Sequence, residues 1–158
     1  YILINDHYER VKDILTEDEI NFGRRLIDNI SVLKEGRICR EFGVNSMHDI
    51  TEGGLLGGIF EVAMACGQGF KIYKDKVPVL DITKKICEEF KIDPLRLISS
   101  GSMLITTCNG GNLVKKLKEH GINAEVIGKI CDKNTVLIDE GKELDVEPPK
   151  RDELFNIQ

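Results

Sequence analysis

The sequence lacks a long apolar run and lacks an excess of positive charge. In its 158 residues, no apolar segment reaches the roughly 20 residues that a membrane-spanning helix requires. The formal net charge is -5. Because nucleic acids and anionic membrane surfaces attract basic proteins, we expect neither as a partner. No signal-peptide pattern is visible either, so we expect a cytoplasmic protein.

Cysteine and histidine are present without the spacing of a metal or disulfide site. The five cysteines form no CxxC pair, and an odd number fits no closed disulfide framework, so we expect reduced thiols. Cys66 and Cys87 lie on the apolar faces of predicted helices and are expected in the core. The three histidines are far apart, so the sequence predicts no metal site in this chain; His48 is of interest because it adjoins Asp49.

The segment around which the chain is organised is Ser46–Ala63. It predicts the end of a strand, a glycine turn and an apolar helix. Asp49 and Thr51 alternate within the strand, so their side chains should point to the same face. Gly53 and Gly54 allow positive φ angles or a close approach of a ligand. Because a helix N-terminus attracts anions, the segment predicts an anion site with a carboxylate and a hydroxyl beside it.

A second interpretation of this segment stays open. Glycines at a strand–helix junction can serve packing alone, and Asp49 or Thr51 can cap the N–H groups of the helix. The motif is neither GxGxxG nor GxxxxGK[ST], so it predicts no dinucleotide fold and no Walker loop. Ser100, Gly101 and Ser102 form another polar turn, which can line a pocket or be an ordinary loop.

The rest of the chain predicts alternating helices and strands. A helical region from Thr16 has a carboxylate three residues on at Glu19, and Gly43 is a plausible stop. Helices are expected over residues 16–42, with a break near 29–31 or at Gly36, and over 81–90 and 113–120. Strands are expected over residues 70–73, 103–107 (central and buried), 124–130 and 135–138, the last two as a hairpin. This order predicts an α+β fold with a mixed, mostly antiparallel sheet packed with helices.

Four segments in register resemble a known family. Met47–Leu55 is similar to M-x-D-x-T-x-G-G-L, and Glu61–Gly69 continues this pattern. Asp93–Leu104 is similar to DPL…(E/S)-G-x-(L/M)-L, and Ala124–Ile130 to A-x-V-I-G-x-(I/V). The chain thus resembles the C-terminal domain of the aminoimidazole ribonucleotide (AIR) synthase-related, PurM-like superfamily, and within it the HypE-like hydrogenase maturation factors.

The resemblance implies half of a two-domain enzyme. It assigns residues 1–15 to a linker or arm from a missing N-terminal half, 16–147 to the PurM-like domain and 148–158 to an extended tail. Because the first residue is Tyr1, we also expect that the chain was cut from a longer protein. The missing half would supply most of the ATP site, metal-binding carboxylates and a homodimer interface. The parent would use ATP and Mg²⁺, and this domain alone would bind neither.

The resemblance also implies roles for the two polar turns. Asp49 and His48 would be catalytic, and phosphate or substrate would bind at Thr51, Glu52, Gly53, Gly54, Ser100, Gly101 and Ser102. A maturation protein would be a further partner. HypE-like enzymes carry a carbamoyl group on a C-terminal cysteine, whereas residues 148–158 contain none, which puts this chemistry in doubt here. The alternative is a non-catalytic binding or assembly module in which the glycine motif is structural.

Overall fold

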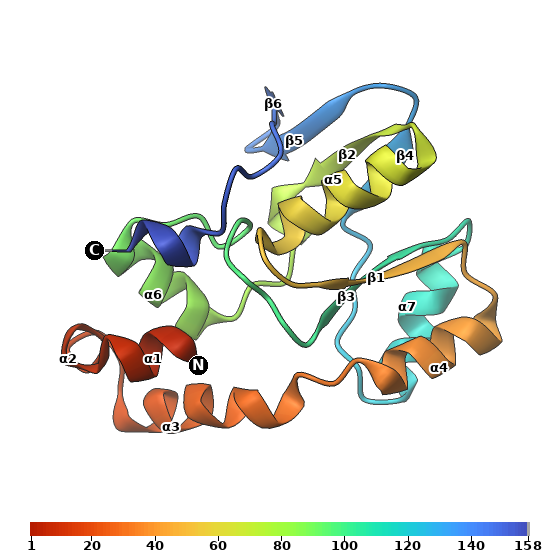
Figure 1. The fold of residues 1–158 in the computed structure, drawn as a ribbon. Helices are drawn as coiled ribbons and strands as arrows, with labels where there is room; N and C mark the ends of the chain where they lie inside the picture. The colour runs from red at the N-terminus through yellow and green to blue at the C-terminus, as the bar shows by residue number, and fades with distance from the viewer. Residues whose placement is uncertain (158) are drawn as a thin grey trace.

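The computed structural model describes residues 1–157, in which helices surround two small β-sheets (Figure 1). The helices are α1 (Ile2–Asp6), α2 (Tyr8–Val11), α3 (Glu17–Arg25), α4 (Leu33–Phe42), α5 (Gly54–Cys66), α6 (Asp81–Phe90) and α7 (Gly110–Glu119). Three short 3-10 helices are η1 (Leu26–Asn29), η2 (Lys74–Lys76) and η3 (Glu153–Asn156). The strands are β1 (Ser46–Ile50), β2 (Gly69–Tyr73), β3 (Ser102–Thr106), β4 (Gly128–Cys131), β5 (Thr135–Asp139) and β6 (Lys142–Asp145). None of these helices has the length and apolarity of a transmembrane span.

The two sheets confirm the predicted α+β class. β1 and β3 form an antiparallel pair in which His48 lies opposite Leu104 and Ile50 opposite Ser102. The second sheet has the order β4-β2-β5-β6, and its only parallel pair within residues 1–157 is β2 with β5. The sheets are therefore mixed and mostly antiparallel. β3 is half-buried and belongs to the two-stranded sheet, so the prediction of a central, buried strand is wrong.

The predicted hairpin between β4 and β5 is also wrong. Both strands pair with β2, one on each side of it, so they do not pair with each other. The turn that connects them crosses the start of β2, where Phe70 N–H donates to the carbonyl of Asn134 at 2.6 Å. A Cβ on Gly69 would lie 2.3 Å from that same carbonyl oxygen. The crossing therefore requires glycine at this position.

The helix ends follow their local sequence signals. Thr16 and Glu19 form a capping box before α3, with Thr16 N–H donating to Glu19 Oε2 at 2.9 Å. Lys85 donates a hydrogen bond to the Glu19 carboxylate, and this contact lowers the pKa of Glu19. The helical region breaks after Asn29, and Gly43 ends α4 with a φ of +82°, both as predicted.

Three apolar clusters hold these elements together. The first joins α1, α2, α3 and α6, the second packs α5 on β2 and β5, and the third lies between α4 and α7. Ile50 and Leu104 of the β1–β3 pair pack in the second cluster, whereas Ile105 packs against the third. The β1–β3 pair is thus held between two cores, which positions the end of β1. Cys87 is buried as expected, but Cys66 is exposed, so its assignment to the core is wrong.

Both ends of the chain pack on the first cluster. Residues 1–15 were expected to form a linker or arm, but residues 2–6 form the helix α1, which buries Leu3 and Ile4. The tail is not fully extended either, because it contains η3 and packs Leu154 and Ile157 on the same cluster. In both cases the local sequence has weak signals, and contact with α6 and its neighbours decides the conformation. Figure 1 shows η3 beside α6, close to the first helices.

A substitution at the buried residue Ile4 tests whether α1 belongs to the core. Ile4 is 1% exposed, and its Cδ1 lies where a Cβ of Gly23 would otherwise be. We expect Ile4→Ala to lower the free energy of unfolding by about 2–4 kcal/mol, through lost burial and a cavity. The control Ile2→Ala, at 36% exposure, should cost less than about 1 kcal/mol. Equal small losses in urea unfolding would show that residues 1–15 are a detachable arm.

Candidate functional site

The candidate site is the turn between β1 and α5. Gly53 and Gly54 both have left-handed backbones, with φ of +77° and +62°, which side chains other than glycine rarely adopt. Gly54 also lies against the loop after α6, because a Cβ there would be 2.5 Å from the carbonyl oxygen of Leu97. Leu56 N–H donates to the carbonyl of Leu95 at 2.9 Å. The start of α5 is therefore joined to the loop that leads toward β3.

A carboxylate from the C-terminal tail already lies on this turn. Gly53 N–H donates to Asp152 Oδ2 at 2.7 Å, and Leu154 N–H donates to Asp152 Oδ1 at 2.8 Å. Asp152 is 4% exposed, and it is the only buried residue with a polar or charged side chain within residues 1–157. Burial of a carboxylate is unfavourable unless hydrogen bonds compensate it, and here both oxygens accept one. The carboxylate that lies on the turn therefore belongs to the chain itself.

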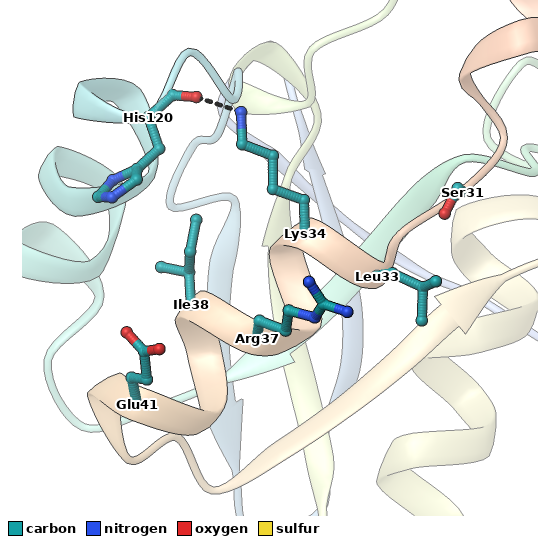
Figure 2. A pocket seen from close by; sticks show the side chains of 7 residues that line it. All are labelled: Ser31, Leu33, Lys34, Arg37, Ile38, Glu41 and His120. Carbon is teal, nitrogen blue, oxygen red and sulfur yellow. Dashed lines mark hydrogen bonds between the residues drawn. The ribbon is translucent and has the colours of Figure 1, made fainter.

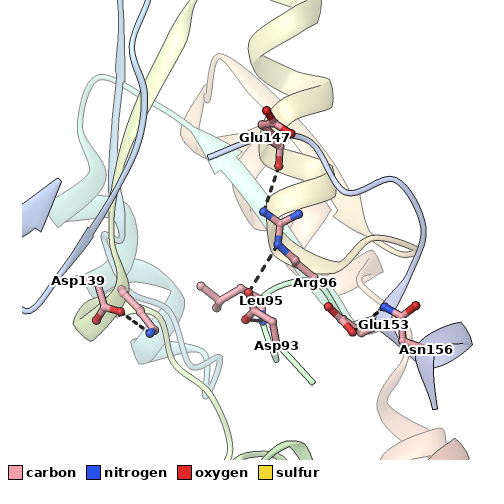
Figure 3. Close-up of polar contacts among 8 residues, drawn as sticks. Asp93, Leu95, Arg96, Asp139, Glu147, Glu153 and Asn156 are labelled. Atoms are coloured by element: carbon pink, nitrogen blue, oxygen red, sulfur yellow. Dashed lines mark hydrogen bonds and ion pairs between the residues drawn. The ribbon is translucent and has the colours of Figure 1, made fainter. Parts of the chain in front are cut away.

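Arg96 contacts the C-terminal tail beside the turn through hydrogen bonds (Figure 3). Its Nη2 donates to the carbonyl of Glu147 at 3.1 Å, and its Nε lies 3.6 Å from Asp93 Oδ2. Its own carbonyl accepts the N–H of Glu153 at 3.2 Å. Pro149 lies against Gly53, 3.6 Å from where a Cβ would be. Arg96 therefore contacts the tail on both sides of the carboxylate that occupies the turn.

The side chains that were predicted to form the site at the first turn do not all point in the same direction. Asp49, Thr51 and Glu52 are all exposed. His48 points instead toward α5, where its Nε2 lies 2.7 Å from Glu61 Oε2 and its ring packs over Gly58. Adjacent residues of a strand face opposite sides, so His48 and Asp49 do not converge on one point. Within residues 1–157, neither Asp49 nor Thr51 caps α5 through its side chain.

The second predicted turn lies at the same end of the β1–β3 pair. Ser102 is opposite Ile50, so the residues before Ser102 run beside those that follow Ile50. Ser102 Oγ lies 3.1 Å from Ser99 Oγ, and Ser100 is exposed. Gly101 has a φ of +90°, and a Cβ there would be 2.7 Å from the carbonyl oxygen of Asn29. The fold thus brings the two turns together along the backbone, while Gly101 packs on the connection between α3 and α4.

The two surface hollows lie away from the glycine turns. One open hollow of about 490 Å³ lies between α4 and the end of α7, where Lys34 Nζ donates to the carbonyl of His120 at 2.6 Å (Figure 2). A second, of about 520 Å³, is lined by residues 73–75 and 138–141. Neither includes a residue of the two glycine turns. Within the described part of the chain, no group of three or more His, Cys, Asp or Glu side chains could hold a metal ion.

The buried thiols are not activated nucleophiles. Burial raises the pKa of the Cys87 thiol to about 11, so this thiol is protonated at neutral pH. Burial and the nearby Glu35 carboxylate also raise the pKa of Cys39. Both residues pack in apolar clusters. Their environment is that of core residues, in agreement with the sequence prediction for Cys87.

Three neighbours of the predicted site were not predicted from the sequence: Asp152, Arg96 and Glu61. Asp152 lies 99 positions from Gly53 in the sequence, in a segment that was expected to be extended. No local pattern marks a carboxylate that becomes buried only when a tail docks. Arg96 directly follows Asp93-Pro94-Leu95. Only its position within the family-like segment Asp93–Leu104 could have indicated it.

Two glycines with the same backbone conformation test how tightly the turn is packed. Gly54 and Gly67 have φ of +62° and +66°, but only Gly54 has backbone atoms in the way of a Cβ. We expect Gly54→Ala to lower the free energy of unfolding by about 3 kcal/mol or more, because both strain and a clash arise. Gly67→Ala should cost about 1 kcal/mol from strain alone. Similar losses in denaturant unfolding would contradict the close packing of Leu97 on the turn.

The chain resembles known proteins in sequence and in fold. The carbamoyl dehydratase HypE of Escherichia coli (strain K12) is 28% identical over 98 residues, which are 60% of this chain and 29% of that protein. The crystal structure of E. coli HypE matches with a TM-score of 0.69 at 25% identity, covering 75% of this chain and 40% of that one. A HypE–HypF complex matches with a TM-score of 0.65 at 27% identity, covering 72% and 39%. A HypE structure with ATP matches with a TM-score of 0.64 at 20% identity, covering 72% and 40%.

Two facts follow from these similarities. The chain spans less than half the length of the relatives that it matches. A family model described as "AIR synthase related protein, C-terminal domain" matches residues 12–140, which is most of the chain and includes both glycine turns. This chain therefore belongs to the family of AIR synthase-related C-terminal domains, and within it is similar to HypE.

Proposed function

We propose that this chain is the C-terminal domain that closes over phosphate and substrate in an ATP-dependent enzyme of the HypE type. Family membership and the similarity to E. coli HypE support this proposal. One structural observation carries it: Gly53 N–H binds a carboxylate next to the exposed Asp49 and Thr51. An amide that binds one anionic oxygen is suited to a phosphate oxygen. In the parent, ATP would supply a phosphoryl group that activates an oxygen of the substrate.

In this proposal, the residues of the turn would have different roles in binding and catalysis. The Thr51 hydroxyl would donate a hydrogen bond to a phosphate oxygen, and the Gly53 and Gly54 backbone would stabilise charge on the transferred group. Asp49 would orient a metal-bound water or a substrate group. His48 is held by Glu61 on the other side of β1, so in this proposal it supports β1 against α5. Ser100 would complete the surface from the neighbouring turn.

The partners in this proposal come from the relatives. One HypE structure contains ATP, and another is a complex with HypF. By analogy, this domain would act with an N-terminal ATP-binding half that holds Mg²⁺, in a cytoplasmic homodimer with a maturation-protein partner. The domain by itself would then have no turnover.

One observation favours the alternative, a non-catalytic binding or assembly module. Three N–H groups at the turn already have partners within the chain. Gly53 donates to Asp152, Gly54 to the carbonyl of Thr51, and Leu56 to the carbonyl of Leu95. With these three donors used internally, the turn would serve structure alone. Activity measurements separate this alternative from the enzymatic proposal.

Asp49 and Thr51 provide the test, because both are exposed and their replacement should hardly affect folding. The substitutions Asp49→Asn and Thr51→Val would be placed in a polypeptide that carries this chain together with the N-terminal ATP-binding half. We expect each to lower the rate of ATP hydrolysis by about 10- to 100-fold, as loss of a group that acts on the reacting phosphate does. The 158-residue chain alone should show no hydrolysis.

The control for both variants is Asp145→Asn. It makes the same change of charge as Asp49→Asn, on the exposed strand β6. It should leave hydrolysis unchanged, and the melting temperatures of all variants should agree closely. Full activity in both Asp49→Asn and Thr51→Val would favour the structural module, and turnover by the chain alone would contradict the proposed division between two halves.

A further inference from the structure

We propose that residues 147–156 form a displaceable latch whose Asp152 carboxylate occupies the anion site of the glycine turn. Ligand and latch would compete for the same N–H of Gly53, so phosphate could bind there only when the tail leaves. This inference rests on the proposed function, because it concerns regulation of the same site. The latch is here defined as the segment from Glu147 to Asn156.

The competition follows from the geometry of one amide. Gly53 N–H donates to Asp152 Oδ2 at 2.7 Å, which is a short, charge-assisted hydrogen bond. An N–H that is directed at one oxygen cannot make an equally good bond to a second one. The carboxylate is buried, and Pro149 lies over Gly53, so the tail also covers the approach to the amide. In this closed arrangement Asp152 takes the position of a phosphate oxygen.

The latch is attached by few contacts. Pro148 and Pro149 have no N–H to donate, and residues 148–157 form no β-strand. The polar contacts with the body of the domain are the Asp152–Gly53 bond and the two backbone contacts of Arg96. Leu154 and Ile157 are only partly buried, and Phe155 is 59% exposed. A segment held in this way can open without unfolding the domain.

Opening exchanges one anion for another. When the tail leaves, Asp152 becomes hydrated and the Gly53 N–H, at the positive end of α5, loses its acceptor. A phosphate group has a greater negative charge and more acceptor oxygens than a carboxylate, so it is a suitable replacement. The measured affinity for phosphate is then the intrinsic affinity multiplied by the fraction of molecules in which the latch is open. Weakening the latch should therefore tighten phosphate binding.

Inorganic phosphate is the probe, and the backbone amide of Gly53 is the reporter. The ¹⁵N-labelled 158-residue chain would be titrated with phosphate at constant ionic strength, and the shift of the Gly53 amide recorded by NMR. Asp152→Asn keeps an oxygen acceptor but removes the charge. We expect this variant to bind phosphate about tenfold more tightly than the wild type, since the closed state loses a charge-assisted hydrogen bond.

A second variant loosens the latch without changing Asp152 or the turn. Arg96→Ala removes the contacts with the Glu147 carbonyl and with Asp93. Arg96→Ala should also tighten phosphate binding at Gly53. This variant tests the latch even if Asp152→Asn does not fold. Asp145→Asn is the matched control for Asp152→Asn, because both substitutions remove one negative charge and Asp145 is an exposed residue outside the latch. Its affinity should equal that of the wild type.

The remaining outcomes distinguish the latch proposal from the proposal that the turn binds phosphate. Equal affinities in wild type, Asp152→Asn and Arg96→Ala, with a shift at Gly53, would overturn the latch but leave the phosphate site in place. Weaker binding in the two variants would overturn the latch as well, because the tail would then complete the site. The absence of any phosphate-dependent shift at Gly53 in all variants would overturn both the latch and the phosphate role of the turn.

Discussion

The hydrogen bond between the Asp152 carboxylate and the Gly53 amide connects two parts of the molecule that lie far apart in the sequence. It joins the C-terminal tail to the turn between β1 and α5, across 99 positions of sequence. A buried carboxylate is tolerated there because Gly53 and Leu154 each donate to one of its oxygens. The buried amide needs a hydrogen-bond acceptor, and the chain provides one. The state of the proposed site thus depends on where the tail lies.

The position of this turn depends in addition on packing from two sides. A pair of strands alone is marginally stable in water, and the β1–β3 pair is such a unit. It is stabilised because Ile50 and Leu104 pack on the core beneath α5, whereas Ile105 packs on the core between α4 and α7. Asp49 and Thr51 remain on an exposed surface while the glycine turn after them is buried. An exposed carboxylate and hydroxyl beside a buried backbone donor suit a surface that becomes covered by another domain.

Membership in the AIR synthase-related family and the similarity to HypE agree with such an arrangement, because the matched part of this chain covers only 29% of E. coli HypE in sequence and 40% of its crystal structure. The family places the glycine turns within its matched region, residues 12–140, whereas Asp152 lies beyond it. The carboxylate that fills the turn is therefore outside the part of the chain that the family model describes.

Much of the local structure could be predicted from the sequence, because its causes lie within a few residues. Thr16 with Glu19 determined the start of α3, Gly43 determined the end of α4, and the apolar spacing after Gly54 determined α5. The glycine turn was likewise recognisable, since only glycine adopts its backbone without strain. What the sequence could not determine involved partners far away in the chain. β2 separates β4 from β5, α1 is helical in contact with the first cluster, and Asp152 is buried only because its tail docks on Gly53. These outcomes depend on long-range packing and hydrogen bonding, which tertiary structure alone decides.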